Sequence, residues 1–144
     1  TWQPVYRLET TSYPWGVAFS PDGYTLLVSS YAGNIDVFST LTRQRRASFA
    51  AHPRLVPGIA FSKDGAYFVT GSESGNVKLW DSVTLRPLAS FDPSPGEVVE
   101  VAFDPKGRFL AAATALRFTA VYDLTKLDPH IQGNRDFWRP AAPK

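Results

Sequence analysis

Histidine is the side chain best suited to move a proton near neutral pH, and this chain has two, His52 and His130. A general base needs its reaction partner and an orienting group within hydrogen-bond reach. His130 stands in a polar segment near the C-terminus, with no paired residue nearby in sequence. His52 follows Ala51 and precedes a proline, in a stretch that reads as a loop. Neither histidine is therefore a strong candidate for general acid–base catalysis.

Carboxylates could also bind a metal or transfer a proton, and they are scattered along the chain. Asp22 and Asp64 stand in Pro-Asp-Gly and Lys-Asp-Gly, where an aspartate typically caps the backbone of a turn. A metal or acid–base role is the alternative. The sequence contains no cysteine, no cluster of metal ligands, no glycine loop that could cradle a phosphate and no nucleophile elbow. We therefore predict no catalytic residue, no metal and no cofactor.

The elements that must position these residues follow a repeat. Three similar heptapeptides occur, at Val17–Gly23, Ile59–Gly65 and Val101–Gly107. Their phenylalanines, at positions 19, 61 and 103, stand 42 residues apart both times. A period of about 40–45 residues is typical of the four-stranded blades of β-propellers.

Each repeat contains further apolar runs separated by turns. The second run lies at Tyr24–Val28, Tyr67–Thr70 and Phe109–Ala113. Gly-Asn pairs at 33–34 and 75–76 then supply turn residues that tolerate positive φ. Residues 76–81 alternate as a strand with one buried face does, and a fourth, shorter strand fits Arg45–Phe49 and Pro87–Phe91. Short strands at regular spacing predict an all-β chain.

The third run of the second repeat, Val77-Lys78-Leu79-Trp80-Asp81, resembles the signature that closes the third strand of a WD-repeat blade. Ala51-His52 stands where that family places its Gly-His pair. The chain is similar to the WD-repeat β-propeller family over roughly residues 5–125. The resemblance implies an all-β fold of three blades and structural roles for His52, Trp80 and Asp81. It also implies a non-catalytic scaffold for protein–protein interactions.

The sequence departs from the family pattern at one recurring position. Many blades carry an aspartate before the third strand, where it joins a histidine, a Ser or Thr and the tryptophan in a buried hydrogen-bond network. This chain has Ala32, Ser74 and Leu116 there. We expect the network to be absent or incomplete, with more reliance on apolar packing. Arg117-Phe118 replaces Gly-Asn in the third repeat, so we expect that hairpin to turn differently.

Strand counting divides the chain into one outer strand, three blades and a tail. Leu8 aligns with Phe49 if one residue is deleted, so residues 1–10 read as the outer strand of a preceding or closing blade. The blades span residues 11–52, 53–94 and 95–127, and residues 128–144 form a tail outside the propeller. Blade 3 lacks a clear outer strand, because Asp128-Pro129 argues against a regular one.

Three blades would leave open faces and unpaired edges, whereas known propellers have about four to eight blades. Three explanations are open. The chain is part of a larger propeller, two copies form a homodimer with one six-bladed ring, or another protein covers the open edges. Because the chain starts at Thr1 rather than Met, a processed form or a fragment is expected.

Aromatic and arginine residues outside the repeat are the candidates for partner contact, since such side chains dominate binding at protein interfaces. Tyr13, Trp15, Arg54 and Leu55 lie in loops that lead into inner strands, on the side where the family usually binds partners. Ordinary packing of these loops is the alternative.

Two further groups are candidates. Arg43, Arg45 and Arg46 lie before and along an outer strand. They either discourage aggregation at a charged edge or bind an acidic partner or an RNA backbone. Phe137 and Trp138, in the tail, either cover the end of blade 3 or anchor in a partner.

Composition narrows the function classes. Hydrophobic residues make up 44% and charged residues 19%, which argues against disorder. The net charge of +2 is low for a dedicated nucleic-acid binder, and no apolar run is long enough to span a membrane. The leading hypothesis is a scaffold whose partners are other subunits of a protein assembly. An RNA- or ribonucleoprotein-associated subunit is the alternative, and a propeller enzyme is the third.

Overall fold

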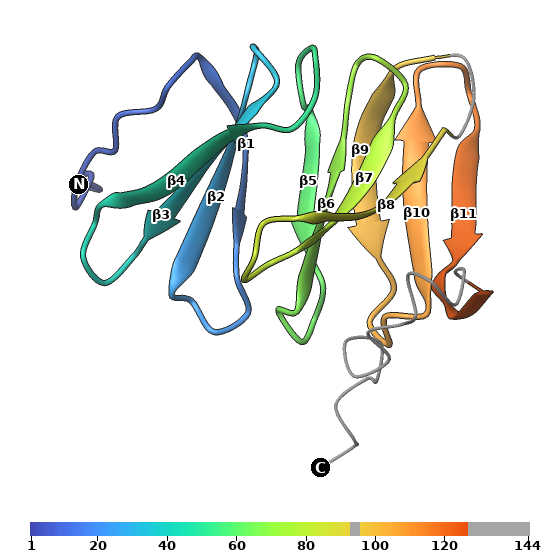
Figure 1. The fold of residues 1–144 in the computed structure, drawn as a ribbon. Helices are drawn as coiled ribbons and strands as arrows, with labels where there is room; N and C mark the ends of the chain where they lie inside the picture. The colour runs from blue at the N-terminus through green and yellow to red at the C-terminus, as the bar shows by residue number, and fades with distance from the viewer. Residues whose placement is uncertain (93–95, 127–144) are drawn as a thin grey trace.

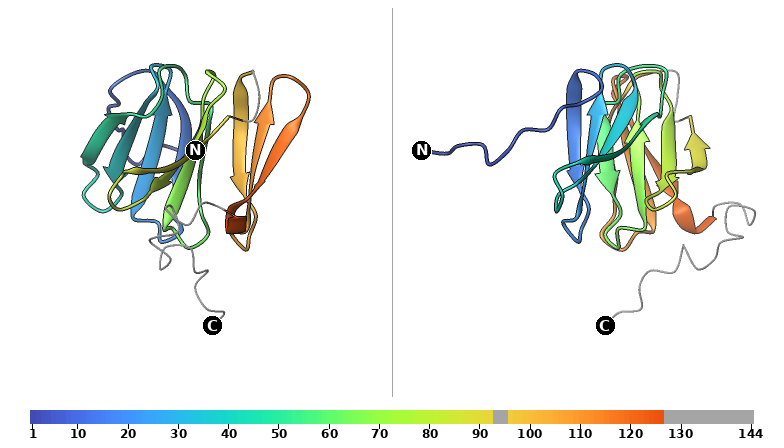
Figure 2. Two further views of the ribbon diagram at one scale, coloured as in Figure 1. Left: turned by 45° about the vertical axis from the view of Figure 1, so that its right-hand side comes forward. Right: turned by 60° about the vertical axis from the view of Figure 1, so that its left-hand side comes forward.

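The computed structural model describes residues 1–92 and 96–126, which form eleven β-strands and one short 3₁₀ helix (Figure 1). The strands make three separate antiparallel sheets that stand side by side (Figure 2). His130, Phe137, Trp138 and the rest of the tail lie outside the described residues.

Each sheet is a meander in chain order, and we call the sheets blades 1 to 3. Blade 1 contains β1 (Pro14–Phe19), β2 (Thr25–Ser30), β3 (Asn34–Ser39) and β4 (Arg45–Ala50). Blade 2 contains β5 (Gly58–Phe61), β6 (Tyr67–Gly71), β7 (Val77–Asp81) and β8 (Pro87–Phe91). Blade 3 contains β9 (Val98–Phe103), β10 (Phe109–Thr114) and β11 (Thr119–Asp123), followed by the 3₁₀ helix η1 (Leu124–Lys126). The predicted all-β architecture of repeated blades is confirmed.

A side chain fixes the turn between the first two strands of a blade. The Ser20 hydroxyl and the Tyr24 N–H both donate to Asp22 Oδ1, at 2.5 and 2.9 Å. Ser62 bonds to Asp64 in the same way in blade 2, at 2.7 Å. These bonds lower the pKa of Asp22, because they stabilise its charged form. The prediction that both aspartates cap turns is confirmed.

The core lies between the sheets, where each blade covers the next. Between blades 1 and 2, Leu27 and Val37 face Phe68 and Trp80, whose rings stack with centroids 6.0 Å apart. Between blades 2 and 3 the buried side chains include Val69, Leu79, Val98, Val101 and Leu110. Each such side chain contributes about 1.5–3 kcal/mol of hydrophobic stabilisation. These two interfaces place the inner strands β1, β5 and β9 side by side.

The β10–β11 hairpin corrects one expectation. Arg117 replaces the glycine of the other two hairpins, yet its φ is 65°, close to the 90° of Gly33 and the 87° of Gly75. The third hairpin therefore turns through the same left-handed conformation with an arginine in place. Such a conformation costs a non-glycine residue about 1–2 kcal/mol.

The N-terminal segment forms no strand within the described chain, and its assignment as the outer strand of a preceding or closing blade stays a prediction. Within the described residues the first strand begins at Pro14, so no outer strand forms between residues 1 and 10. A strand needs a neighbour with which to exchange backbone hydrogen bonds, and the described chain holds no other strand of a preceding blade. The segment instead lies in irregular conformation against blade 1, where Thr11 N–H and hydroxyl donate to the buried Asp36 carboxylate at 2.7 and 3.0 Å.

Candidate functional site

The residue best suited to acid–base chemistry, His52, is enclosed between blades 1 and 2. It is 4% exposed, and its Nε2 lies 2.7 Å from Thr70 Oγ1. Trp80 Nε1 donates to the same oxygen at 2.8 Å, so the Thr70 hydroxyl proton is free to point at His52. Burial, assisted by the positive charge of Lys78, lowers the pKa of His52 to about 4. The ring is therefore neutral at pH 7 and out of reach of a substrate.

His52, Thr70 and Trp80 form the hydrogen-bond network of the family without its aspartate. Ser74 occupies the aspartate position but bonds to Ser72 instead, with its hydroxyl donating at 3.0 Å. His52 Nδ1 is buried and has no hydrogen-bond partner among the described residues. The expectation of an incomplete network is confirmed. Phe38 and Tyr122 stand at the tryptophan position in the other blades, where apolar packing takes over.

Asp81, the second residue of the Trp-Asp pair, closes the turn after β7. It is 2% exposed, and its Oδ1 accepts hydrogen bonds from the N–H groups of Val83 and Thr84, at 2.9 and 2.7 Å. The carboxylate therefore caps the backbone of the turn, as a turn aspartate does.

Among residues 1–92 and 96–126, no three His, Asp or Glu side chains gather closely enough to hold a metal ion. No helix in those ranges has the length and apolar character to cross a membrane.

The surface with the strongest binding character lies at one end of the blades, at the top of Figure 1. Strand register places the loops there, because Pro14 pairs with Ser30 and Asn34 with Ala50. We call this end the loop rim and define it by its exposed side chains. They are Tyr13, Trp15, Tyr31, Arg54, Leu116, Arg117 and Phe118.

The candidates that the sequence placed in these loops differ in their exposure. Tyr13 is 83% exposed, and Trp15 and Arg54 are also exposed. Leu55 is buried instead. Its backbone carbonyl accepts hydrogen bonds from Ser72 Oγ and Glu73 N, which hold this part of the loop beside the end of β6. Leu55 is therefore not part of the loop rim.

Sequence reasoning missed Tyr31, Leu116, Arg117 and Phe118. All four lie in turns between the second and third strands, which the antiparallel register returns to the same end as the other loops. The Tyr31 N–H donates to the Tyr13 carbonyl at 2.9 Å. The regular succession of antiparallel strands in the sequence was the signal that could have located these four residues at this end of the blades.

Close backbone contacts hold this end of the molecule in shape. A Cβ on Gly33 would stand 2.0 Å from the His52 carbonyl oxygen, so only glycine fits where the β2–β3 turn meets the next loop. The N–H groups of Ala51 and His52 donate to the Gly33 carbonyl, at 3.0 and 3.1 Å. Tyr31 and Arg54 thus project from backbone segments that are bonded or packed together.

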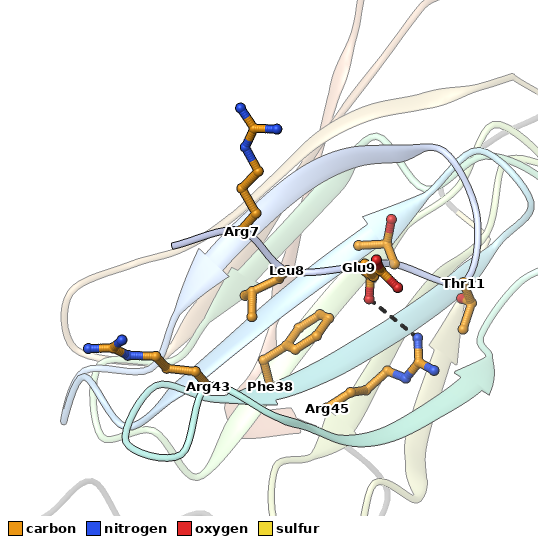
Figure 3. Close-up of a pocket in the computed structure, with 8 residues that line it drawn as sticks. Arg7, Leu8, Glu9, Thr11, Phe38, Arg43 and Arg45 are labelled. Atoms are coloured by element: carbon orange, nitrogen blue, oxygen red, sulfur yellow. Dashed lines mark hydrogen bonds between the residues drawn. The ribbon is translucent and has the colours of Figure 1, made fainter. Parts of the chain in front are cut away.

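The basic run lies at a different place, along the outer edge of blade 1 (Figure 3). An open hollow of about 430 Å³ lies there, lined in part by Leu8, Phe38, Arg43 and Arg45. The Arg43 guanidinium lies over the Tyr6 ring, 4.9 Å from its centroid. Arg45 Nη1 donates to the Glu9 carbonyl at 3.4 Å.

The charges of this edge are not neutralised by the part of the chain that the structure describes. Arg43, Arg45 and Arg46 are exposed and make no ion pair with a described carboxylate. They lie away from the loop rim, since β4 begins at the end of the blade opposite to it.

A family model described as "WD domain, G-beta repeat" matches residues 2–39 and 43–81, together more than half of the chain. Both matches end with the third strand of a blade, at Ser39 and at Asp81. No curated protein matches the chain.

Proposed function

The chain belongs to the WD-repeat family, and from that premise we propose that it is a non-catalytic scaffold whose loop rim binds other protein subunits. Proteins of this family generally mediate protein–protein interactions. The observation that supports the proposal is the collection of exposed aromatic and arginine side chains at one end of all three blades. Aromatic and arginine side chains carry most of the binding free energy at protein interfaces.

The rim also has the rigidity that binding favours. Four of its side chains, Tyr31, Leu116, Arg117 and Phe118, project from short turns between strands. The Tyr13–Tyr31 backbone bond and the Gly33 contact join neighbouring segments. Pre-ordered loops lose less conformational entropy on binding than mobile ones do. The enclosed His52, by contrast, offers no accessible group for catalysis.

The test compares proteins recovered with the tagged chain from cells that make it. With a Tyr13→Ala, Trp15→Ala, Arg117→Ala variant, the recovered amount of specific partner subunits is expected to fall by at least about tenfold. Each hot-spot truncation costs roughly 2 kcal/mol or more of binding free energy. The matched control is Tyr24→Ala, Leu41→Ala, which removes exposed apolar area at the opposite end of the blades. Recovery that falls equally in both variants, or in neither, would refute a binding role for the rim.

The basic edge supports a second candidate, an RNA-associated subunit, because its arginines lack described carboxylate partners. Binding of labelled oligouridine should then weaken steeply with salt, since phosphate contacts release counterions. Replacing Arg43, Arg45 and Arg46 by alanine should reduce that salt dependence. Binding that is indifferent to salt, or unchanged in the variant, removes this candidate.

A further inference from the structure

We propose that Ser48 is a phosphorylation site for a kinase that selects arginines ahead of its target, and that the phosphate breaks the Thr11–Asp36 contact that holds residues 1–11 on blade 1. This goes beyond the scaffold role and stands independently of it, since the chain accepts or refuses phosphate without any partner subunit. Three observations carry the proposal: the residues before Ser48, the exposure of its side chain, and the buried carboxylate of Asp36 beside it.

Ser48 follows two arginines at a spacing that a kinase can recognise. Arg45 and Arg46 stand three and two positions before it. Kinases distinguish their substrates by charge pattern, because acidic side chains in the substrate groove pair with arginines at fixed distances from the serine. Among all serines and threonines of the sequence, Ser48 alone follows arginines at both positions. The sequence therefore indicates Ser48 as the target of a kinase of this class.

The two arginines are available to such a kinase. Both are exposed, and neither makes an ion pair with a described carboxylate. The hydrogen bond of Arg45 to the Glu9 carbonyl is long, at 3.4 Å. The β3–β4 register shifts between Arg45 and Ala47, so Arg46 stands in a bulge that interrupts the backbone ladder. A kinase thus meets an extended segment whose pairing is already interrupted two residues before the serine.

The Ser48 side chain is exposed on the outer strand of blade 1. Ser90 occupies the same position one repeat later, where it pairs with Lys78. Trp80, two residues from Lys78 and therefore on the same face of the sheet, packs against blade 1. Ser90 is nevertheless exposed. A neighbouring blade thus leaves this position of an outer strand accessible, so the exposure of Ser48 does not depend on what lies beside blade 1.

Ser48 lies beside the contact that joins residues 1–11 to blade 1. It pairs with Asp36 across the β3–β4 ladder, so the two side chains leave the sheet on the same face. The Asp36 carboxylate is 1% exposed and accepts hydrogen bonds from the N–H and the hydroxyl of Thr11, at 2.7 and 3.0 Å. The Thr11 hydroxyl also lies 3.4 Å from Ser48 Oγ. A group added to Ser48 Oγ therefore comes directly against this contact.

A phosphate on Ser48 brings like charge to the Thr11–Asp36 contact. It carries a charge of about −1.5 to −2 at pH 7, and its oxygens compete with the carboxylate for the Thr11 hydroxyl. Asp36 makes no ion pair with a described cation that could offset the repulsion. Arg45 lines the same hollow as Thr11, and a phosphate is a stronger acceptor for its guanidinium than the Glu9 carbonyl (Figure 3). We therefore expect both bonds that hold residues 1–11 to break.

The kinase and ATP supply the phosphoryl group, and the chain supplies its acceptor. The Ser48 oxygen forms a bond to the γ-phosphorus of ATP, while the bond from that phosphorus to its bridging oxygen breaks. ADP leaves with the electron pair of that bond. The hydroxyl proton of Ser48 passes to the catalytic carboxylate of the kinase.

The first test treats the folded full chain with ATP and the catalytic subunit of cyclic-AMP-dependent kinase, which selects this arginine spacing. The intact mass should show one added phosphate, and fragment masses should place it on Ser48. Arg45→Ala, Arg46→Ala should slow its incorporation by at least about tenfold, because the charge pairs with the kinase are lost. The matched control is Arg86→Ala, an exposed arginine before the outer strand β8, which should leave the rate unchanged.

The second test is hydrogen exchange in the phosphorylated chain. The Thr11 amide should exchange at least about tenfold faster, because it loses a hydrogen bond to a charged group. The His52 amide, which donates to the Gly33 carbonyl, should keep its rate, which separates release of residues 1–11 from general unfolding. A Ser48→Ala chain treated with the kinase should show no change at Thr11.

Three results would overturn the proposal. Phosphate that reaches Ser48 only after urea is added shows that the folded chain does not present the site. Thr11 exchange that is unchanged or slower in the phosphorylated chain shows that the phosphate leaves the contact with Asp36 intact or strengthens it. Equal acceleration at Thr11 and His52 shows unfolding of the blades rather than release of residues 1–11.

Discussion

At the scale of single residues, one hydroxyl group organises the contact between blades 1 and 2. Thr70 Oγ1 bonds to both His52 and Trp80, and all three side chains are buried. The family pattern marked His52 and Trp80 as structural positions, but it did not name Thr70 as the residue that joins them. It could not predict that His52 Nδ1 would stay without a described partner, since that depends on where Ser74 points.

The lowered pKa of His52 makes stability depend on pH. The fold holds the ring neutral with a pKa of about 4, whereas the unfolded chain binds a proton near pH 6.5. Stability is therefore complete above pH 6.5 and is lost as pH falls toward 4, by about 3 kcal/mol in total. Urea unfolding at several pH values measures this loss.

The control for this prediction is His52→Gln, which cannot titrate. Its unfolding free energy should lack the decline between pH 6.5 and 4.5. The exposed carboxylates with lowered pKa, such as Asp22 and Asp104, affect stability only at lower pH. Equal pH dependence in both proteins would contradict the enclosed, neutral histidine.

At the scale of elements, the hairpins could be predicted from the sequence because their signals are local. The Gly and Asp turn residues and the alternating strands lie within a few residues of one another, and the structure places strands at each predicted run. The outer strand predicted for residues 1–10 stays a prediction, because a strand requires neighbours and the described chain contains no preceding blade. Leu55 was predicted to contact a partner but is buried, and its backbone bonds to Ser72 and Glu73, which a local sequence pattern does not reveal.

The β10–β11 hairpin offers a prediction that separates stability from binding. Arg117→Gly should raise the free energy of unfolding by about 0.5–1 kcal/mol, because glycine adopts the left-handed conformation without strain. The same change should weaken partner binding through the loop rim. Denaturant midpoints and recovery of partners measure the two effects.

The matched control is Arg46→Gly, which makes the same chemical change within strand β4. Glycine in a strand should lower stability by about 0.5–1 kcal/mol. If both variants shift stability in the same direction, the left-handed backbone of Arg117 is not a source of strain.

At the scale of the whole molecule, the described chain is a stack of three blades, with a core between each blade and the next. The period of 42 residues predicted that stack, because every interblade contact repeats the same positions. The loop rim was only partly predicted, since it gathers residues from turns up to about a hundred positions apart. The proposed scaffold role is consistent with this shape, because the candidate binding residues share one end of the blades.

The most direct test of the scaffold claim is the native mass of the particle that contains this chain in the cells that make it. We predict a particle that contains at least one other subunit besides this chain and that loses this subunit, and its mass, in the Tyr13→Ala, Trp15→Ala, Arg117→Ala variant. A particle made only of copies of this chain, with the same mass in the variant, would contradict the scaffold role.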